Sequence, residues 1–296
     1  MGLAAMLLGA CFDFDATMAD GPLADGGPTG LDAGLDATLA DGSPPADANH
    51  AGDASGDAGG PPTTDAGPFC PPPPSEGGIF FCDDFDEDPL PGKWNTVGET
   101  GGTLAETDAS AVSKPNSLDE TTMPASNGQV VNVALREFLS VPSVPATLRF
   151  AFAVEPVQID VTANAAIVLG AVDFLDAAGN RYSVGLAINV SGAAPALALG
   201  EQSGFIDGGI DYVSHPLLPT EPLAMNAWSE VVIEIDWTAA TTANGIVIVN
   251  GTQELDVPLT ITVQPTELQI GVGTSYVSEP APIWELRYDN VVFTAP

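Results

Sequence analysis

The first part of the sequence lacks most of the residue types that build a folded core. Residues 12–68 contain no Lys, Arg, Glu, Trp, Tyr or Ile, and Asp, Ala, Gly, Pro and Thr dominate there. Such a segment cannot bury enough apolar surface to offset the entropy lost on ordering. Its prolines and like charges favour an extended spacer. These absences predict a disordered acidic stalk over residues 11–76 and one folded domain over residues 77–296.

Positive charge is scarce throughout the chain. There are 6 Lys and Arg against 40 Asp and Glu, a formal net charge of −34 at pH 7. Nucleic acid is therefore excluded as a partner, because phosphates need a basic surface, and so is charge-driven docking on anionic lipids. We interpret the acidity as a source of solubility rather than of divalent-cation binding. All six cations lie in the domain: Lys93, Lys114, Arg136, Arg149, Arg181 and Arg287.

The N-terminus has an apolar run that is too short to cross a membrane, since a spanning helix needs about 20 apolar residues. It ends in Leu8-Gly9-Ala10-Cys11, which resembles the lipobox of bacterial lipoproteins. The resemblance implies a signal peptide over residues 1–10 and a lipid on Cys11, the only membrane contact expected. No Lys or Arg precedes Cys11, and a natural start upstream of Met1 would supply one. Phe12, not Asp, follows the Cys, which in that family favours display at the outer membrane or cell surface.

Cysteine is also rare, with three in the chain. If Cys11 carries a lipid, Cys70 and Cys82 remain as a pair, and a disulfide between them would join the end of the stalk to the first strand. Such bonds persist in oxidising compartments, which agrees with export. The alternatives are two free thiols or half of a metal site, but a zinc site would need further ligands near by.

The domain shows little helical periodicity and strong alternation of apolar and polar residues. Alternation runs through residues 148–154, 182–190 and 231–237, and residues 163–175 form one long apolar run that we interpret as a buried strand. Asn250-Gly251 and residues 176–180 are hairpin turn signals. About a dozen strands separated by such turns predict an all-β antiparallel sandwich or barrel.

Motifs near both ends of the domain resemble concanavalin A-like (laminin-G-like) jelly-roll domains. They are Phe81-Cys-Asp-Asp-Phe-Asp86, Trp94, Pro115-Asn-Ser-Leu118, Trp228 to Asp236, Gly245 to Gly251, Leu268 to Gly271 and Tyr288 to Val292. The resemblance implies an antiparallel two-sheet β-sandwich whose first and last strands lie close together. Lectins, glycoside hydrolases, lyases and adhesion modules share this fold, so the resemblance leaves the function open.

One strand resembles a catalytic motif. Glu234-Ile235-Asp236-Trp237 is similar to the catalytic strand of laminarinase-type glycoside hydrolases, in which a second Glu follows. Retaining hydrolysis needs two carboxyl groups, yet Thr238 and Ala239 stand where that Glu belongs. We therefore expect no enzyme of this type, and interpret Glu234 and Asp236 as the solvent-facing residues of a strand whose other face enters the core.

Two further groups are candidate binding residues. Asp83, Asp84 and Asp86 could approach Asp289 and Asn290 and hold a structural calcium ion; the alternative is that they cap turns. Sugar binding would use exposed aromatic rings in loops, for which Tyr212, Tyr276 and Trp94 are candidates, whereas we expect Trp228 and Trp237 in the core and His215 at the surface.

These features together favour a surface-displayed module that binds extracellular polysaccharide or glycan and is tethered by its lipid. One alternative is a hydrolase or lyase acting on polysaccharide. The other is a structural or adhesive component of the cell envelope without a small ligand.

Overall fold

A computed structural model describes residues 69–73, 77–87, 89–124, 130–141, 143–160, 165–190, 195–204, 210–217, 223–239, 242–261, 263–277 and 283–296. The predicted signal peptide, Cys11 and most of the predicted stalk lie outside these ranges. Within them, no helix is long and apolar enough to cross a membrane. Every regular element that the structure describes is a β-strand.

The strands are β1 (Ile79–Asp83), β2 (Thr96–Thr100), β3 (Gly102–Thr107), β4 (Ser117–Thr122), β5 (Val130–Ser140), β6 (Thr147–Gln158), β7 (Ala165–Leu175), β8 (Arg181–Val190), β9 (Pro195–Gly204), β10 (Ile210–Pro216), β11 (Ser229–Ala239), β12 (Thr242–Val249), β13 (Thr252–Thr260), β14 (Glu267–Val277) and β15 (Glu285–Ala295).

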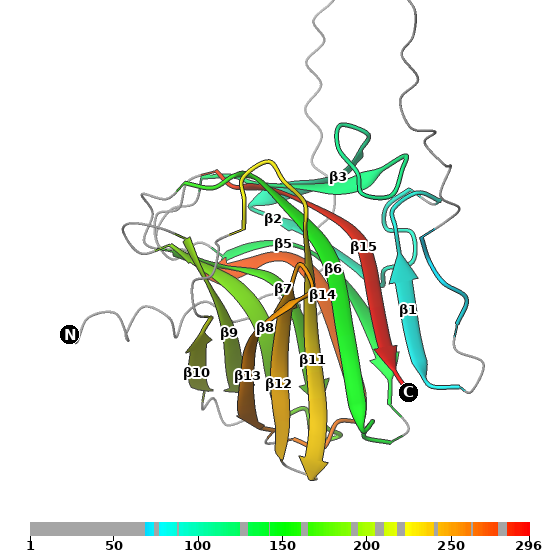
Figure 1. Cartoon of the computed structure of the whole chain (residues 1–296), viewed down its shortest axis with the longest axis vertical. Coiled ribbons are helices and arrows are strands. Elements are labelled where there is room, and N and C mark those ends of the chain that lie inside the picture. Colours follow the sequence, from blue (N-terminus) through cyan, green and yellow to red (C-terminus); the bar gives the residue numbers. More distant parts are fainter. Residues whose placement is uncertain are drawn as a thin grey trace, which may run out of the picture. The chain divides into compact units, whose positions relative to one another are not determined.

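The strands form two antiparallel sheets. The eight-stranded sheet has the order β13-β12-β11-β6-β15-β4-β3, with β1 added beside β15. The seven-stranded sheet has the order β10-β9-β8-β7-β14-β5-β2. Figure 1 shows β12, β11, β6 and β15 side by side in one layer, with β5, β7, β8 and β14 behind them. The predicted two-sheet antiparallel sandwich is confirmed.

The core lies between the two sheets and is built from the side chains on one face of each strand. Fully buried aromatic side chains at its centre include Phe150, Phe152, Phe174, Tyr182 and Tyr288. Alternation therefore does what the sequence predicts: one set of side chains enters the core, and the other faces outward. Trp237, expected in the core, is half-buried and packs against the core residue Phe174 with ring centroids 5.6 Å apart. Trp228 is only half-buried, and its indole donates to the Ser110 hydroxyl at 2.9 Å, so it does not belong to the central core.

Both predicted hairpin turns are present. Asn250 and Gly251 adopt positive φ angles of 50° and 77° between β12 and β13, the backbone form that a two-residue turn requires. Between β7 and β8, the Asp176 carboxylate accepts hydrogen bonds from the amides of Ala178 and Asn180, at 2.8 and 2.9 Å.

The first and last strands lie side by side, as the jelly-roll resemblance implies. The strand β15 pairs with β4 through Glu285–Tyr288 and with β1 through residues 291–295. Figure 1 shows β1 (cyan) beside β15 (red), next to the C-terminus. Cys70 and Cys82 form the predicted disulfide, which joins residue 70 to β1.

One carboxyl group is buried between the sheets. Glu120 on β4 is 1% exposed and accepts a hydrogen bond from the Thr274 amide of β14 at 3.0 Å. Burial raises the pKa of Glu120 to about 8, although contacts with Thr274 and Tyr288 act in the opposite direction. A group with this pKa keeps its proton at neutral pH, so the core holds a neutral acid rather than a carboxylate.

Candidate functional site

The outward face of the seven-stranded sheet carries a row of polar residues, which we call the polar row. Register places Gln269 of β14 beside Asp173 of β7, then Ser183 of β8 and Gln202 of β9. The backbone of Tyr212 on β10 completes the row next to Gln202. These residues alternate with core residues on their own strands, which places the described side chains on the face turned away from the core.

Beside the polar row runs a row of small residues. From one strand to the next, Gly271, Ala171, Gly185 and Gly200 are register partners, with Arg136 of β5 at one end and Ser214 of β10 at the other. At these positions no side chain extends beyond Cβ above the sheet backbone. A smooth strip bordered by polar groups suits a long, hydroxyl-rich chain molecule.

Arg136 and Asn132 form a pair at the β5 end of this face. The Arg136 guanidinium donates to Asn132 Oδ1 at 2.5 Å, and both residues are buried at 5% exposure. Asn132 lies over Gly98 of β2, where a Cβ atom would stand 2.5 Å from Asn132 Nδ2. A planar guanidinium offers paired N–H donors in the geometry that a carboxylate accepts.

Two buried side-chain oxygen atoms on this face lack a hydrogen-bond partner among the described residues. Asp173 is 2% exposed, and its Oδ2 accepts from Arg181 at 2.5 Å, but its Oδ1 has no hydrogen-bond partner in the described part of the chain. The buried Gln202 Oε1 also lacks one there. Native proteins pair nearly all such atoms. Two acceptors on this face are thus without a donor among the described residues.

Replacing Gly98 tests whether this face is held as the structure describes. Gly98→Ala would push Asn132 aside and shift Arg136 with it, because the new Cβ would clash with Asn132 Nδ2. We expect polysaccharide binding to weaken about 10-fold, the loss of roughly one hydrogen bond to a charged group. Gly204→Ala on β9 is the matched control, since a Cβ there meets nothing within 4 Å. Equal affinities of the two variants would show that the Asn132 and Arg136 pair is not part of the site.

The predicted sugar-binding aromatics are placed differently from the expectation. Trp94 is 3% exposed, packs edge-on against Phe81 with centroids 4.7 Å apart, and donates to Asp83 Oδ2 at 2.6 Å. It cannot stack on a sugar ring, so this prediction is wrong. Tyr212 and Tyr276 lie in strands β10 and β14 rather than in loops. Their side chains lie outside the described residues, and their role in binding stays a prediction.

The carboxylates of the hydrolase-like motif, Glu234 and Asp236, lie on the outward face of the eight-stranded sheet. Glu234 is register partner of Arg149, and the two side chains form an ion pair at 3.4 Å; Glu230 also approaches Arg149, at 3.9 Å. Ile233 and Ile235, which alternate with Glu234 and Asp236 along β11, enter the core as expected. These carboxylates thus form surface ion pairs and are separated from the polar row by the whole core.

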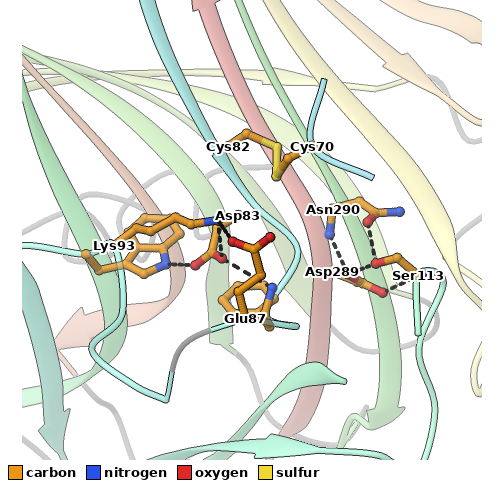
Figure 2. Close-up of a disulfide and its surroundings, with 10 residues drawn as sticks. Cys70, Cys82, Asp83, Glu87, Lys93, Ser113, Asp289 and Asn290 are labelled. Atoms are coloured by element: carbon orange, nitrogen blue, oxygen red, sulfur yellow. Dashed lines mark hydrogen bonds and ion pairs between the residues drawn. A yellow bond between two sulfur atoms is a disulfide. The ribbon is translucent and has the colours of Figure 1, made fainter. Parts of the chain in front are cut away.

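Two of the acidic residues proposed for calcium, Asp83 and Asp289, have protein partners (Figure 2). Asp289 accepts hydrogen bonds from the amides of Val112, Ser113 and Asn290 and from the Ser113 hydroxyl, at 2.7 to 2.9 Å. Asp83 accepts from Trp94 and contacts Lys93 at 3.6 Å. Donors that point at a carboxylate occupy the positions a cation would need, so Asp289 acts as a loop cap.

The other residues proposed for calcium differ in their partners, and calcium binding stays a prediction. Asp86 accepts from the Asn116 amide at 2.7 Å, and Asn290 accepts from the Ser113 hydroxyl, also at 2.7 Å. Asp84 is buried, and neither carboxylate oxygen has a partner among the described residues. No group of three or more His, Cys, Asp or Glu side chains suited to a metal occurs in the part of the chain that the structure describes.

His215 belongs to a cluster that the sequence does not reveal. It was expected at the surface, but its Nε2 lies 2.5 Å from Glu201 Oε1 and its side chain is only 20% exposed. Glu201 also accepts from the Tyr182 hydroxyl and, at 3.2 Å, from the Thr260 amide. Burial and the nearby Glu201 raise the pKa of Tyr182. The cluster joins edge strand β10 to β8, β9 and the end of β13.

Comparison with solved structures finds β-sandwiches of similar fold. An endo-β-1,4-glucuronan lyase from the fungus Trichoderma reesei matches with a TM-score of 0.56 at 14% identity, covering 73% of this chain and 95% of that chain. The sandwich shares its fold with a polysaccharide lyase. An alginate lyase from Aplysia kurodai is more distant, with a TM-score of 0.49 and 12% identity over 69% of this chain and 92% of that one. No protein-family model matches the sequence, and no curated protein matches it.

Proposed function

We propose that the domain acts on polysaccharide, and that the outward face of the seven-stranded sheet holds the sugar chain. The unpaired acceptors Asp173 Oδ1 and Gln202 Oε1 support this most directly. Hydroxyl groups recur along a sugar polymer, and each can donate a hydrogen bond to an acceptor of this kind. The strip of Gly271, Ala171, Gly185 and Gly200 lets the rings lie close to the sheet.

The sugar that suits this face carries a carboxylate. Arg136 places a guanidinium at the end of the small-residue strip, as the register partner of Gly271 on the neighbouring strand. In an otherwise strongly acidic protein, a local cation selects an anionic group by charge and by paired hydrogen bonds. Partial burial strengthens both interactions relative to an open surface.

Cleavage by elimination is the reaction this arrangement supports. A base removes the proton on the carbon next to the uronate carboxylate, and the C–H electron pair is delocalised into that carboxylate. The pair then forms a double bond to the neighbouring carbon as the bond from that carbon to the glycosidic oxygen breaks, and the oxygen takes up a proton. Arg136 would stabilise the negative charge that develops on the carboxylate. Tyr212, at the end of the polar row beside Gln202, is our candidate for the proton transfers. The fold shared with a glucuronan lyase supports this choice over binding alone.

Tyr212→Phe tests the reaction separately from binding. We expect the full chain to raise the ultraviolet absorbance of a uronate polymer as the double bond forms, and the variant to lose at least 100-fold in rate, because general acid–base groups contribute about that much. Binding, measured by affinity electrophoresis, should change less than about 3-fold, since one hydroxyl contact at most is lost. Tyr276→Phe is the matched control and should keep the rate.

Three outcomes of this experiment differ in meaning. Binding without any rise in absorbance would leave the binding module that the sequence analysis favoured and remove the lyase. A rise that Tyr212→Phe does not slow would move the base elsewhere. Failure of the full chain to bind any of a panel of acidic and neutral polysaccharides would overturn the proposed function.

A further inference from the structure

The disulfide decides where tension on the N-terminal segment enters the folded domain. Cys82 is the fourth residue of β1 and pairs with Val292 of β15, whereas Ile79 begins β1 and pairs with Ala295. A pull on the chain before Cys70 would reach Ile79 first without the disulfide. With it, the pull passes through the two sulfur atoms to Cys82 and bypasses residues 71–81 (Figure 2).

These two entry points load the β1–β15 pair in different geometries. The strands are antiparallel, so the start of β1 lies beside the C-terminal end of β15. Opposed pulls at Ile79 and at the C-terminus act on the same end of the pair and separate it one hydrogen-bonded step at a time. Opposed pulls at Cys82 and at the C-terminus act on opposite ends, so the residue pairs from Ile79 to Cys82 must fail together.

Residues that follow Cys82 form a buried anchor for this load. Asp83 accepts hydrogen bonds from the Trp94 indole at 2.6 Å and from the Phe85 amide at 3.2 Å. Phe85 and Trp94 are 2% and 3% exposed. By contrast, Ile79 and Phe80 are only half-buried, and Gly77 and Gly78 precede them. The weak start of β1 is therefore the part that the disulfide relieves of tension.

We propose that the Cys70–Cys82 disulfide is a mechanical clamp that converts peeling of β1 into shear, so that tension on the N-terminal segment does not open the domain. This goes beyond the proposed function and does not depend on which sugar the domain holds. Tension of this kind would arise if Cys11 carries a lipid, as the lipobox resemblance implies. A domain that is bound to a polymer would then be pulled from its N-terminal side.

Optical-tweezers measurements on the full chain, with handles at both ends, test the clamp. Cys11→Ser in every sample prevents unwanted cross-linking, and the oxidised chain is compared with Cys70→Ser/Cys82→Ala. We expect an early step at low force in the variant alone. Once β1 has been peeled to residue 82, the variant should be longer than the oxidised chain by about 35 Å, because an extended chain spans ~3.3–3.6 Å per residue and the disulfide holds the two Cα atoms 5.7 Å apart.

A further sample keeps Cys70 and Cys82 and is treated with a thiol reductant. It should show the same early step without any substitution in β1. Sugar binding at zero force should stay unchanged in all samples, which separates this test from that of the proposed function. Equal forces for the first step in the oxidised, reduced and substituted chains would overturn the clamp.

Discussion

Glu120→Gln is expected to make the domain more stable at alkaline pH by on the order of 5 kcal/mol, because about 1.4 kcal/mol accompanies each unit of pKa difference between the folded and unfolded chain. Burial raises the pKa of Glu120 from 4.5 to about 8 in the folded protein. The unfolded chain therefore releases its proton at lower pH than the folded chain does. Stability contributed by the protonated acid is fully present below pH 4.5 and is lost as the pH rises to about 8. Gln cannot ionise, so the variant escapes this loss and still accepts from the Thr274 amide.

Urea denaturation at pH 5 and pH 9 measures this effect. The unsubstituted protein should lose stability between the two values, whereas Glu120→Gln should lose much less. Glu230→Gln is the control on the surface of β11: its side chain is 62% exposed and lies 3.9 Å from Arg149, a contact expected to contribute less than about 1 kcal/mol at either pH. If the free energy of unfolding fell equally for Glu120→Gln and for the unsubstituted protein between pH 5 and 9, Glu120 would be ionised in the folded protein.

The fold was predictable where the signal is local. Alternation over residues 182–190 and 231–237 depends only on which residues are apolar, and β8 and β11 follow it. The turn at Asn250-Gly251 depends on two residues that tolerate positive φ. The jelly-roll resemblance added what alternation cannot show, namely that the first and last strands are neighbours.

The site was less predictable because it is assembled across strands. Gln269, Asp173, Ser183 and Gln202 come from four strands and meet only through sheet register. Local pattern could have shown that Asn132 and Arg136 share a face opposite to the apolar residues of β5, but not what lies beside them. Burial of Trp94 depends on Asp83, eleven residues earlier, and that of Glu120 on Thr274, 154 residues later. A lone Trp or Glu in the sequence carries no sign of such partners.

Arg136→Met is expected to weaken binding of a uronate polymer 10- to 100-fold, which corresponds to the ~1.5–3 kcal/mol of hydrogen bonds to a charged group. Met resembles the apolar stem of Arg and removes the charged guanidinium with its donors. Binding of a neutral polymer, which depends on Asp173 and Gln202 accepting from hydroxyls, should change far less. The ratio of the two affinities therefore reports on charge recognition rather than on general damage to the face.

Arg149→Met provides the matched control for this ratio. Arg149 lies on the outward face of the eight-stranded sheet, where it contacts Glu230 and Glu234, so its loss removes a cation of the same kind from a surface outside the proposed site. Thermal unfolding should first establish that both variants fold. A selective loss for Arg136→Met alone places the carboxylate of the sugar at β5. An equal loss in both variants would mean that the protein's overall charge, rather than the polar face, controls recognition.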